Sequence, residues 1–272
     1  MSTITPIAPR SRTASAGRGS DPTRRATSTG QHSGYAAAAD RQHVQLPTFV
    51  PVLEEVELDG WSSHPHALSG NFHDWMLLGG GRILVMVGQA AGQEPCDPIE
   101  TALVAQATWT ALRAHAQHTD DAGRLLTLAA RTLWTNPTMH QQASVAVALV
   151  DSVGGSASLA IAGDALACRV RAAVWEQLPG EQPPLGAETR FDYAAQEFAL
   201  SLRERLLLVA DHRAYRPAKL TASIAAEFTQ LDAETHRRMT AAETLAIARK
   251  RYERETHNSP LASASIVALR RR

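Results

Sequence analysis

The side chains that could do chemistry in this 272-residue chain stand near the ends of apolar segments. Residues 69–74 read Ser-Gly-Asn-Phe-His-Asp, and residues 87–92, at the end of a later apolar run, read Val-Gly-Gln-Ala-Ala-Gly. Amide oxygens such as those of Asn71 and Gln89 can join the shell of a hard cation, but they supply no charge. A third apolar run ends at Asp211, which is charged. These positions predict a polar site at strand ends with few negative charges.

Apolar patterning predicts the elements that position these residues. The continuous apolar run at 83–87 is typical of a strand buried on both faces, and it delivers Gln89 to the following loop. Apolar residues recur every three or four positions in 98–117 and 121–135, which predicts two amphipathic helices. Further strands are expected at 49–53, 56–60, 144–150, 158–161, 165–170, 173–178, 198–200, 206–210 and 265–269, and further helices at 219–231 and 233–254.

The order of these elements predicts an α+β fold. Strands, helices, strands, helices and a last strand indicate a four-layer α/β/β/α sandwich, in which helices flank two antiparallel sheets. The strands between 144 and 178 are expected to form one antiparallel meander. The glycines at 79–81 join two apolar strands, so we expect a hairpin turn there, since a phosphate-binding loop would lead into a helix.

The N-terminal segment differs in composition from the rest of the chain. Residues 1–42 hold almost no large apolar side chain, so we expect a disordered basic arm followed by one folded domain at 43–272. Five arginines against two aspartates make the arm basic, as in a transit peptide or an electrostatic tether, although a plain solvated tail is the simpler interpretation.

Composition narrows the class of protein further. A formal net charge of zero gives no reason to expect nucleic acid or an anionic membrane as the main partner. The chain holds no apolar run of the ~18 residues that a membrane span needs. Cys96 and Cys168 form neither a disulfide framework nor a metal-ligand cluster, which suits a reducing compartment. We therefore expect a cytoplasmic protein without a membrane span.

The order and spacing of the motifs resemble the SpoIIE-like branch of the PPM-type metal-dependent serine/threonine phosphatases. The family pattern reads Gly-Gly-Asp-Phe-Tyr-Asp, then a strand, then Gly-Asp-Val-Ser-Gly, and residues 69–74 and 87–92 fit this frame. Later family motifs correspond to 149–151, 161–164, 184–186, 208–212 and 262–265, so the resemblance covers about 46–271. It implies two Mn²⁺ or Mg²⁺ ions that activate a water to attack the phosphorus of phosphoserine or phosphothreonine.

The resemblance also shows where this chain departs from the family. The expected metal-binding carboxylates fall on Asn71, Gln89, Asp211 and Ser263, and only Asp211 keeps its charge, with Asp74 retained in a supporting position. Two divalent ions roughly 4 Å apart repel by on the order of 16 kcal/mol at an effective dielectric constant of about 20, which carboxylates must offset. The resemblance therefore implies a pseudophosphatase to which no catalytic residues are assigned. Asn71, Gln89 and Ser263 would line its cleft as degenerate metal positions.

A regulatory scaffold in bacterial partner-switching signalling is the function that this resemblance implies. Its partner would be a STAS-domain anti-anti-sigma factor or a kinase, and Mn²⁺ or Mg²⁺ would bind weakly at most. The alternative is an active phosphatase with a rearranged metal site. A transition-metal site made from His73, His212, Asp74 and Asp211 is a further alternative. The simpler interpretation is that the two histidines are ordinary packing residues.

Overall fold

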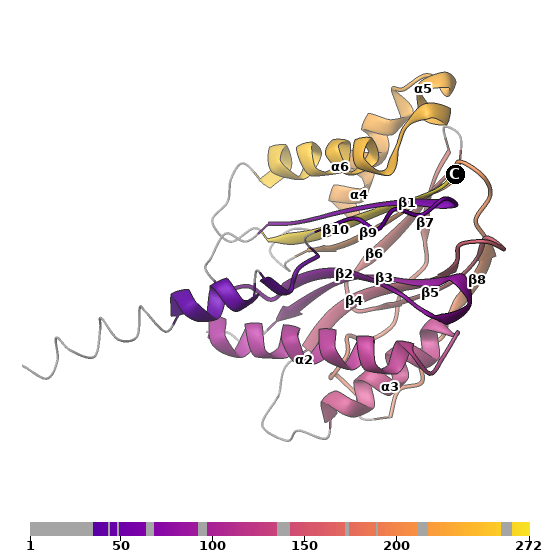
Figure 1. The fold of residues 1–272 in the computed structure, drawn as a ribbon. Coiled ribbons are helices and arrows are strands. Elements are labelled where there is room, and N and C mark those ends of the chain that lie inside the picture. The colour runs from indigo at the N-terminus through magenta and orange to yellow at the C-terminus, as the bar shows by residue number, and fades with distance from the viewer. Residues whose placement is uncertain are drawn as a thin grey trace, which may run out of the picture.

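Two five-stranded antiparallel sheets pack face to face in the computed structural model, and helices cover both outer faces (Figure 1). One sheet, sheet A, has the strand order β1-β10-β9-β6-β7, and the other, sheet B, has the order β2-β3-β4-β5-β8. The structure describes residues 35–42, 44–47, 49–63, 68–91, 97–134, 142–171, 174–188, 190–211, 217–256 and 263–272. The predicted α+β sandwich is confirmed.

The bounds of the elements follow the apolar pattern closely. The strands are β1 (Val56–Ser62), β2 (Asn71–Leu77), β3 (Arg82–Ala91), β4 (Gln142–Asp151), β5 (Ser156–Ala162), β6 (Leu166–Arg171), β7 (Val174–Leu178), β8 (Gln196–Ala199), β9 (Arg205–Asp211) and β10 (Ala264–Arg271). The helices are η1 (Gly79–Gly81), α2 (Pro98–Ala116), α3 (Ala122–Trp134), α4 (Pro217–Thr229), α5 (Ala233–Arg238) and α6 (Ala241–Thr256). The glycines of η1 join β2 to β3, as the predicted hairpin requires.

Three apolar clusters hold the layers together. The first lies between sheet B and helices α2 and α3, the second between the two sheets, and the third between sheet A and helices α4 and α6. Successive residues of a strand point to opposite faces, so β3 sends Leu84 and Met86 toward α2 and sends Val85 and Val87 toward sheet A. Membership of a cluster therefore tells which face each strand residue occupies.

Helix caps explain where the helices of the second half begin. The predicted single helix at 233–254 is wrong, because the chain breaks it into α5 and α6. Thr240 Oγ1 accepts from the Glu243 N–H at 3.2 Å, while Glu243 Oε2 accepts from the Thr240 N–H at 2.7 Å. This reciprocal capping box starts a new helix at Ala241. Its sequence signal, Thr-Ala-Ala-Glu, is visible in the chain.

Two strand predictions also need correction. Residues 49–53 form no strand, and the side chains of Phe49 and Val52 are 74% and 97% exposed. Pro51 lacks a backbone N–H, which disfavours ladder pairing there. The expected meander is split, because β4 and β5 pair in sheet B while β6 and β7 pair in sheet A.

The segment before the sandwich contains a short helix. Residues 35–42 are helical, although composition predicts that the arm is disordered to residue 42, and the earlier part of the arm lies outside the described residues. Alanines at 36–39 favour a helix, and Ala39 is buried. The Gln42 side chain bonds both the N–H and the carbonyl of Ser69, which anchors this helix to the first motif. Among the described helices, none has the length and apolar character needed to cross a membrane.

Candidate functional site

The two motifs lie on neighbouring antiparallel strands, so their polar residues meet. Asn71 at the start of β2 pairs in register with Gln89 near the end of β3, and Phe72 pairs with Gly88. A Cβ atom at Gly88 would lie 2.1 Å from Cζ of Phe72, and one at Gly70 would lie 2.3 Å from the Ala90 carbonyl oxygen. The motif glycines are therefore required for close approach, which brings Asn71 and Gln89 side by side.

Asn71, Gln89 and Ser263 form what we term the neutral cluster, at one end of the sandwich between the sheets. The Ser263 hydroxyl donates to Asn71 Oδ1 at 3.4 Å, and Asn71 Nδ2 donates to the Ser63 carbonyl at 3.0 Å. Gln89 Nε2 donates to the Ala90 carbonyl at 2.8 Å, whereas its Oε1 is buried without a hydrogen-bond partner in the described part of the chain. All three side chains are buried, and none carries a charge.

Asp211 lies at the same end of sheet A but faces the helices. It pairs in register with Ala264, which packs in the apolar cluster between sheet A and helices α4 and α6. Residues opposite each other on neighbouring strands share a face, so Asp211 points to the α6 side. There the hydroxyl of Tyr252 donates to Asp211 Oδ1 over 3.5 Å. The one carboxylate at a family metal position is thus directed away from the space between the sheets.

Asp74 lies on the other outer face, between β2 and α2. Its Oδ2 accepts from Trp109 Nε1 at 2.8 Å and from Arg113 Nη1, and its Oδ1 accepts from the Trp75 N–H at 2.8 Å. Burial raises the pKa of Asp74, although Arg113 and the other donors act to lower it. The structure therefore places Asp74 in a β2–α2 contact, and does not bring it to the neutral cluster.

His73 points between the sheets and connects them. Its Nδ1 lies 2.7 Å from Ser62 Oγ, which in turn lies 2.6 Å from Ser265 Oγ. As neighbours on one strand, His73 and Asp74 face opposite sides, so they cannot ligate one ion together. His212 lies outside the described residues, and within the described ones no three His, Cys, Asp or Glu side chains are close enough to hold a metal ion.

Sequence reasoning did not find the partners of the two aspartates. Trp109 and Arg113 are four residues apart on α2, so they share a helix face, but nothing in the sequence shows that this face meets β2. Tyr252 likewise reaches Asp211 from α6, 41 residues away.

A cavity that Asn71 helps to line has a volume of about 20 Å³, which is room for roughly one water molecule.

Solved structures with the same architecture define the class of fold. The SiaA-PP2C domain of Pseudomonas aeruginosa aligns with a TM-score of 0.65 and 14% identity, over 90% of this chain and 98% of that one. The RsbU and RsbW domains of Rv1364c from Mycobacterium tuberculosis align with a TM-score of 0.60 and 18% identity, over 82% of this chain and 61% of that one. RsbX in complex with magnesium aligns with a TM-score of 0.61 and 6% identity, over 82% and 99%. The chain therefore has the fold of PP2C-type (PPM) phosphatase domains.

The sequence itself gives the family. The profile of Stage II sporulation protein E (SpoIIE) matches residues 79–266, which is more than half of the chain. This protein belongs to the SpoIIE family. A search of curated proteins finds no match.

Proposed function

We propose that this SpoIIE-family domain has lost metal-dependent phosphoester hydrolysis and serves as a protein-binding regulatory scaffold in the bacterial cytoplasm. One observation carries the proposal: the residues gathered between the sheets at the motif end, Asn71, Gln89 and Ser263, are all neutral and hydrogen-bonded. The two acidic candidates, Asp74 and Asp211, face opposite outer sides of the sandwich. Under this proposal the partner recognises the surface of the fold, and no phosphoester is hydrolysed.

The neutral cluster does not fit the two divalent ions that PPM phosphatases use. Mg²⁺ and Mn²⁺ prefer carboxylate oxygens, and two such ions need several negative charges to offset their repulsion. Among the described residues, Gln89 Oε1 is the oxygen of the cluster without a hydrogen-bond partner, and it adds no charge. Asn71 Oδ1 already accepts from Ser263. No hydrolytic step through a metal-bound water is therefore assigned to these residues.

The proposed partner is a STAS-domain anti-anti-sigma factor or a kinase of a partner-switching system. Support comes from the similarity to proteins of such systems, among them RsbX and a chain in which RsbU and RsbW domains occur together. The test is a pull-down from the source cell with the full chain as bait. If the pull-down recovers neither a STAS-domain protein nor a kinase, this choice of partner is wrong. The loss of hydrolysis is tested by a separate experiment.

Calorimetry with Mn²⁺ and Mg²⁺, combined with phosphatase assays, tests the loss of hydrolysis. We expect no saturable heat and no turnover of p-nitrophenyl phosphate or a phosphoserine peptide. The alternative is an active phosphatase with a rearranged metal site. Mn²⁺-dependent turnover that disappears in Asp211→Ala, but persists in the matched variant Asp192→Ala at an exposed position of the 190–195 loop, would establish that alternative.

Restoring the charges gives a second test. The triple variant Asn71→Asp, Gln89→Asp and Ser263→Asp places three carboxylates where the family carries them, so we expect measurable Mn²⁺ binding to appear. The variant Ser62→Asp, on β1 with its side chain also between the sheets, serves as a control for added charge alone. Equal Mn²⁺ binding by the wild-type protein and the triple variant would contradict the proposal.

A further inference from the structure

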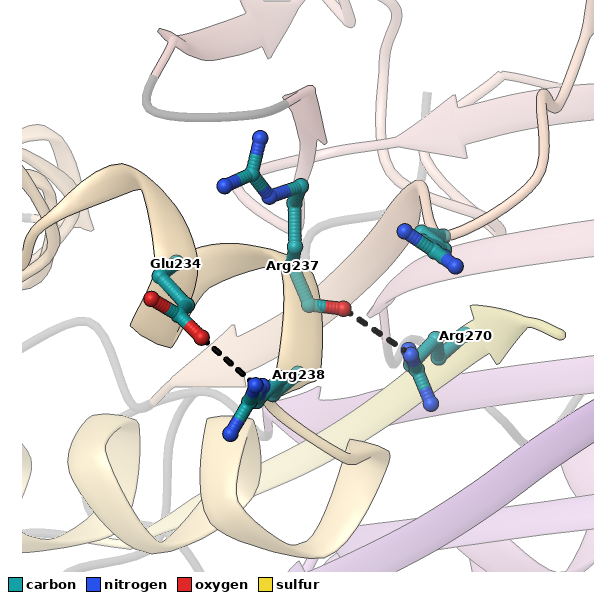
Figure 2. Close-up of a pocket in the computed structure, with 5 residues that line it drawn as sticks. Glu234, Arg237, Arg238 and Arg270 are labelled. Atoms are coloured by element: carbon teal, nitrogen blue, oxygen red, sulfur yellow. Dashed lines mark hydrogen bonds and ion pairs between the residues drawn. The ribbon is translucent and has the colours of Figure 1, made fainter.

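An arginine-lined pocket lies on the helix side of sheet A, at the end of the strands away from the neutral cluster. Its lining residues are Arg203, Glu234, Arg237, Arg238 and Arg270, and its volume is about 540 Å³. Figure 2 shows Glu234 and Arg238 of α5 facing each other, with the Arg237 carbonyl turned toward Arg270 of β10. Four arginines against one glutamate make this arginine pocket strongly positive.

Two of the four arginines that line the pocket are paired with carboxylates. Glu234 pairs with Arg238 at 2.6 Å, and Arg270 binds Glu57 Oε1 at 3.0 Å and the Arg237 carbonyl at 3.1 Å. The guanidinium groups of Arg203 and Arg237 are exposed and form no hydrogen bond or ion pair within the described ranges. At least two guanidinium groups therefore remain available to a ligand.

Another arginine, which is buried beneath the pocket, adds to its positive potential. Arg205 pairs in register with Arg270 and is 1% exposed. Its Nη2 donates to His236 Nδ1 at 2.9 Å, and His236 Nε2 lies 2.7 Å from the Phe228 carbonyl oxygen. Arg205 Nε and Nη1, and Arg270 Nε, are buried without hydrogen-bond partners among the described residues. Burial, and then the charge of Arg270, lower the pKa of Arg205 to about 10.

The pocket is independent of the family's metal site. Arg205 begins β9 and Asp211 ends it, six positions along a strand that rises about 3.3 Å per residue, so the two lie on the order of 20 Å apart. A ligand in the arginine pocket would touch α5, the turn before β9 and the end of β10. Nothing bound there would reach Asn71 or Gln89.

We propose that the arginine pocket binds the phosphate group of a phosphate monoester. Guanidinium groups match phosphate oxygens with paired N–H donors, and a dianion held by Arg203 and Arg237 would offset the excess positive charge. A phosphorylated side chain of a partner protein and a small phosphorylated molecule share this chemistry. The pocket binds the phosphate and holds no residue arranged to cleave it.

Titration calorimetry of the full chain in phosphate-free buffer tests this proposal. The probes are inorganic phosphate, a phosphoserine peptide and the same peptide without phosphate. The double variant Arg203→Gln/Arg237→Gln removes two exposed guanidinium groups, and Arg124→Gln/Arg131→Gln on α3 removes two exposed arginines from the far side of the molecule. We expect the first variant to weaken phosphate binding about tenfold per arginine, a loss of ~1.4 kcal/mol each, and the second to change it less than twofold.

Each outcome of the titration either supports or overturns the proposal. Tighter binding of the phosphopeptide than of inorganic phosphate supports a phosphorylated protein as the ligand, and equal affinity supports a small phosphorylated molecule. Absence of saturable binding by either phosphate probe, or an equal loss in both double variants, overturns the proposal. Unfolding curves that superimpose for all three proteins would show that a loss of binding does not come from a loss of folding.

Discussion

Replacing Arg205 with methionine is expected to stabilise this protein. Burial lowers the pKa of Arg205 from its ordinary value to about 10, so the buried charge costs the folded state ~3 kcal/mol, since each pKa unit corresponds to ~1.4 kcal/mol. Methionine has a similar length and fills the site without a charge. Loss of the hydrogen bond to His236 costs ~1 kcal/mol, and loss of the Phe228 ring contact costs ~0.5 kcal/mol. A net gain of about 1 to 2 kcal/mol should remain.

Urea unfolding followed by circular dichroism, at pH 7 and pH 10 without phosphate, measures this gain. The folded-state pKa of Arg205 lies below its unfolded value, so the destabilising charge is fully present below about pH 10 and disappears as the pH rises further. Arg205→Met should therefore exceed wild type in stability by nearly the same amount at pH 7 and pH 10, and the difference should shrink only above pH 10.

Arg237→Met is the matched control, because Arg237 lies in the same field but is exposed. Its free energy of unfolding should stay within about 0.5 kcal/mol of wild type. A loss of more than 2 kcal/mol in Arg205→Met would refute the reasoning, because it would show that the guanidinium group is better compensated in the folded protein than its contacts indicate.

Three further predictions concern packing and ion pairs elsewhere. Gly88→Ala should cost ~1 to 3 kcal/mol in urea unfolding, because its Cβ would meet the Phe72 ring, whereas Gly79→Ala, with open space around it, should be close to neutral. Asp74→Ala should cost ~2 kcal/mol through the loss of the Arg113 and Trp109 bonds and leave the Mn²⁺ titration unchanged. Burial acts to raise the pKa of Glu204, but hydrogen bonds from the Ser201 N–H, Arg169 and Arg171 outweigh burial and lower this pKa. The free energy of unfolding of the wild-type protein should therefore fall as the pH drops through the lowered pKa of Glu204. Glu204→Gln should show a weaker dependence on pH between 7 and 3.

Each of these predictions has a clear contrary result. Equal losses in Gly88→Ala and Gly79→Ala would mean that the Phe72 ring moves aside freely. A change in Mn²⁺ binding by Asp74→Ala would place that carboxylate at a metal site after all. Parallel pH profiles for wild type and Glu204→Gln would show that the two arginines do not hold the Glu204 carboxylate in its charged form.

Much of the secondary structure could be predicted because burial imposes a period on the sequence. The run at 83–87 is apolar at every position since β3 is covered by α2 on one face and by sheet A on the other. Residues 49–53 are also largely apolar, yet they form no strand, since Pro51 interrupts them and Val52 is exposed. Apolar composition alone therefore does not establish strand pairing. The assignment of β5 and β6 to different sheets depends on long-range contacts, which no local pattern contains.

The candidate site likewise has parts that the sequence predicts and parts that depend on long-range contacts. Motif spacing places Asn71 beside Gln89, because a hairpin fixes the register of its two strands. The contact of Ser263 with Asn71, 192 positions away, follows only from the family resemblance. Strand alternation shows that Asp74 and Asn71 face opposite sides, and this could have been predicted from their odd separation. The burial of Arg205 could not, because an arginine that follows two other charged residues is normally exposed.

The hydrogen bond between Ser263 and Asn71 joins the two sheets through uncharged groups. Ser263 leads into β10 of sheet A and Asn71 begins β2 of sheet B, so this bond fixes the spacing of the layers at the motif end. Neither side chain titrates near neutral pH, and neither needs a cation to hold it in place. The spacing should therefore be the same in chelator and in millimolar Mg²⁺. A protein that docks at this end is expected to meet one fixed surface, whether the cell is starved of divalent metal or replete with it.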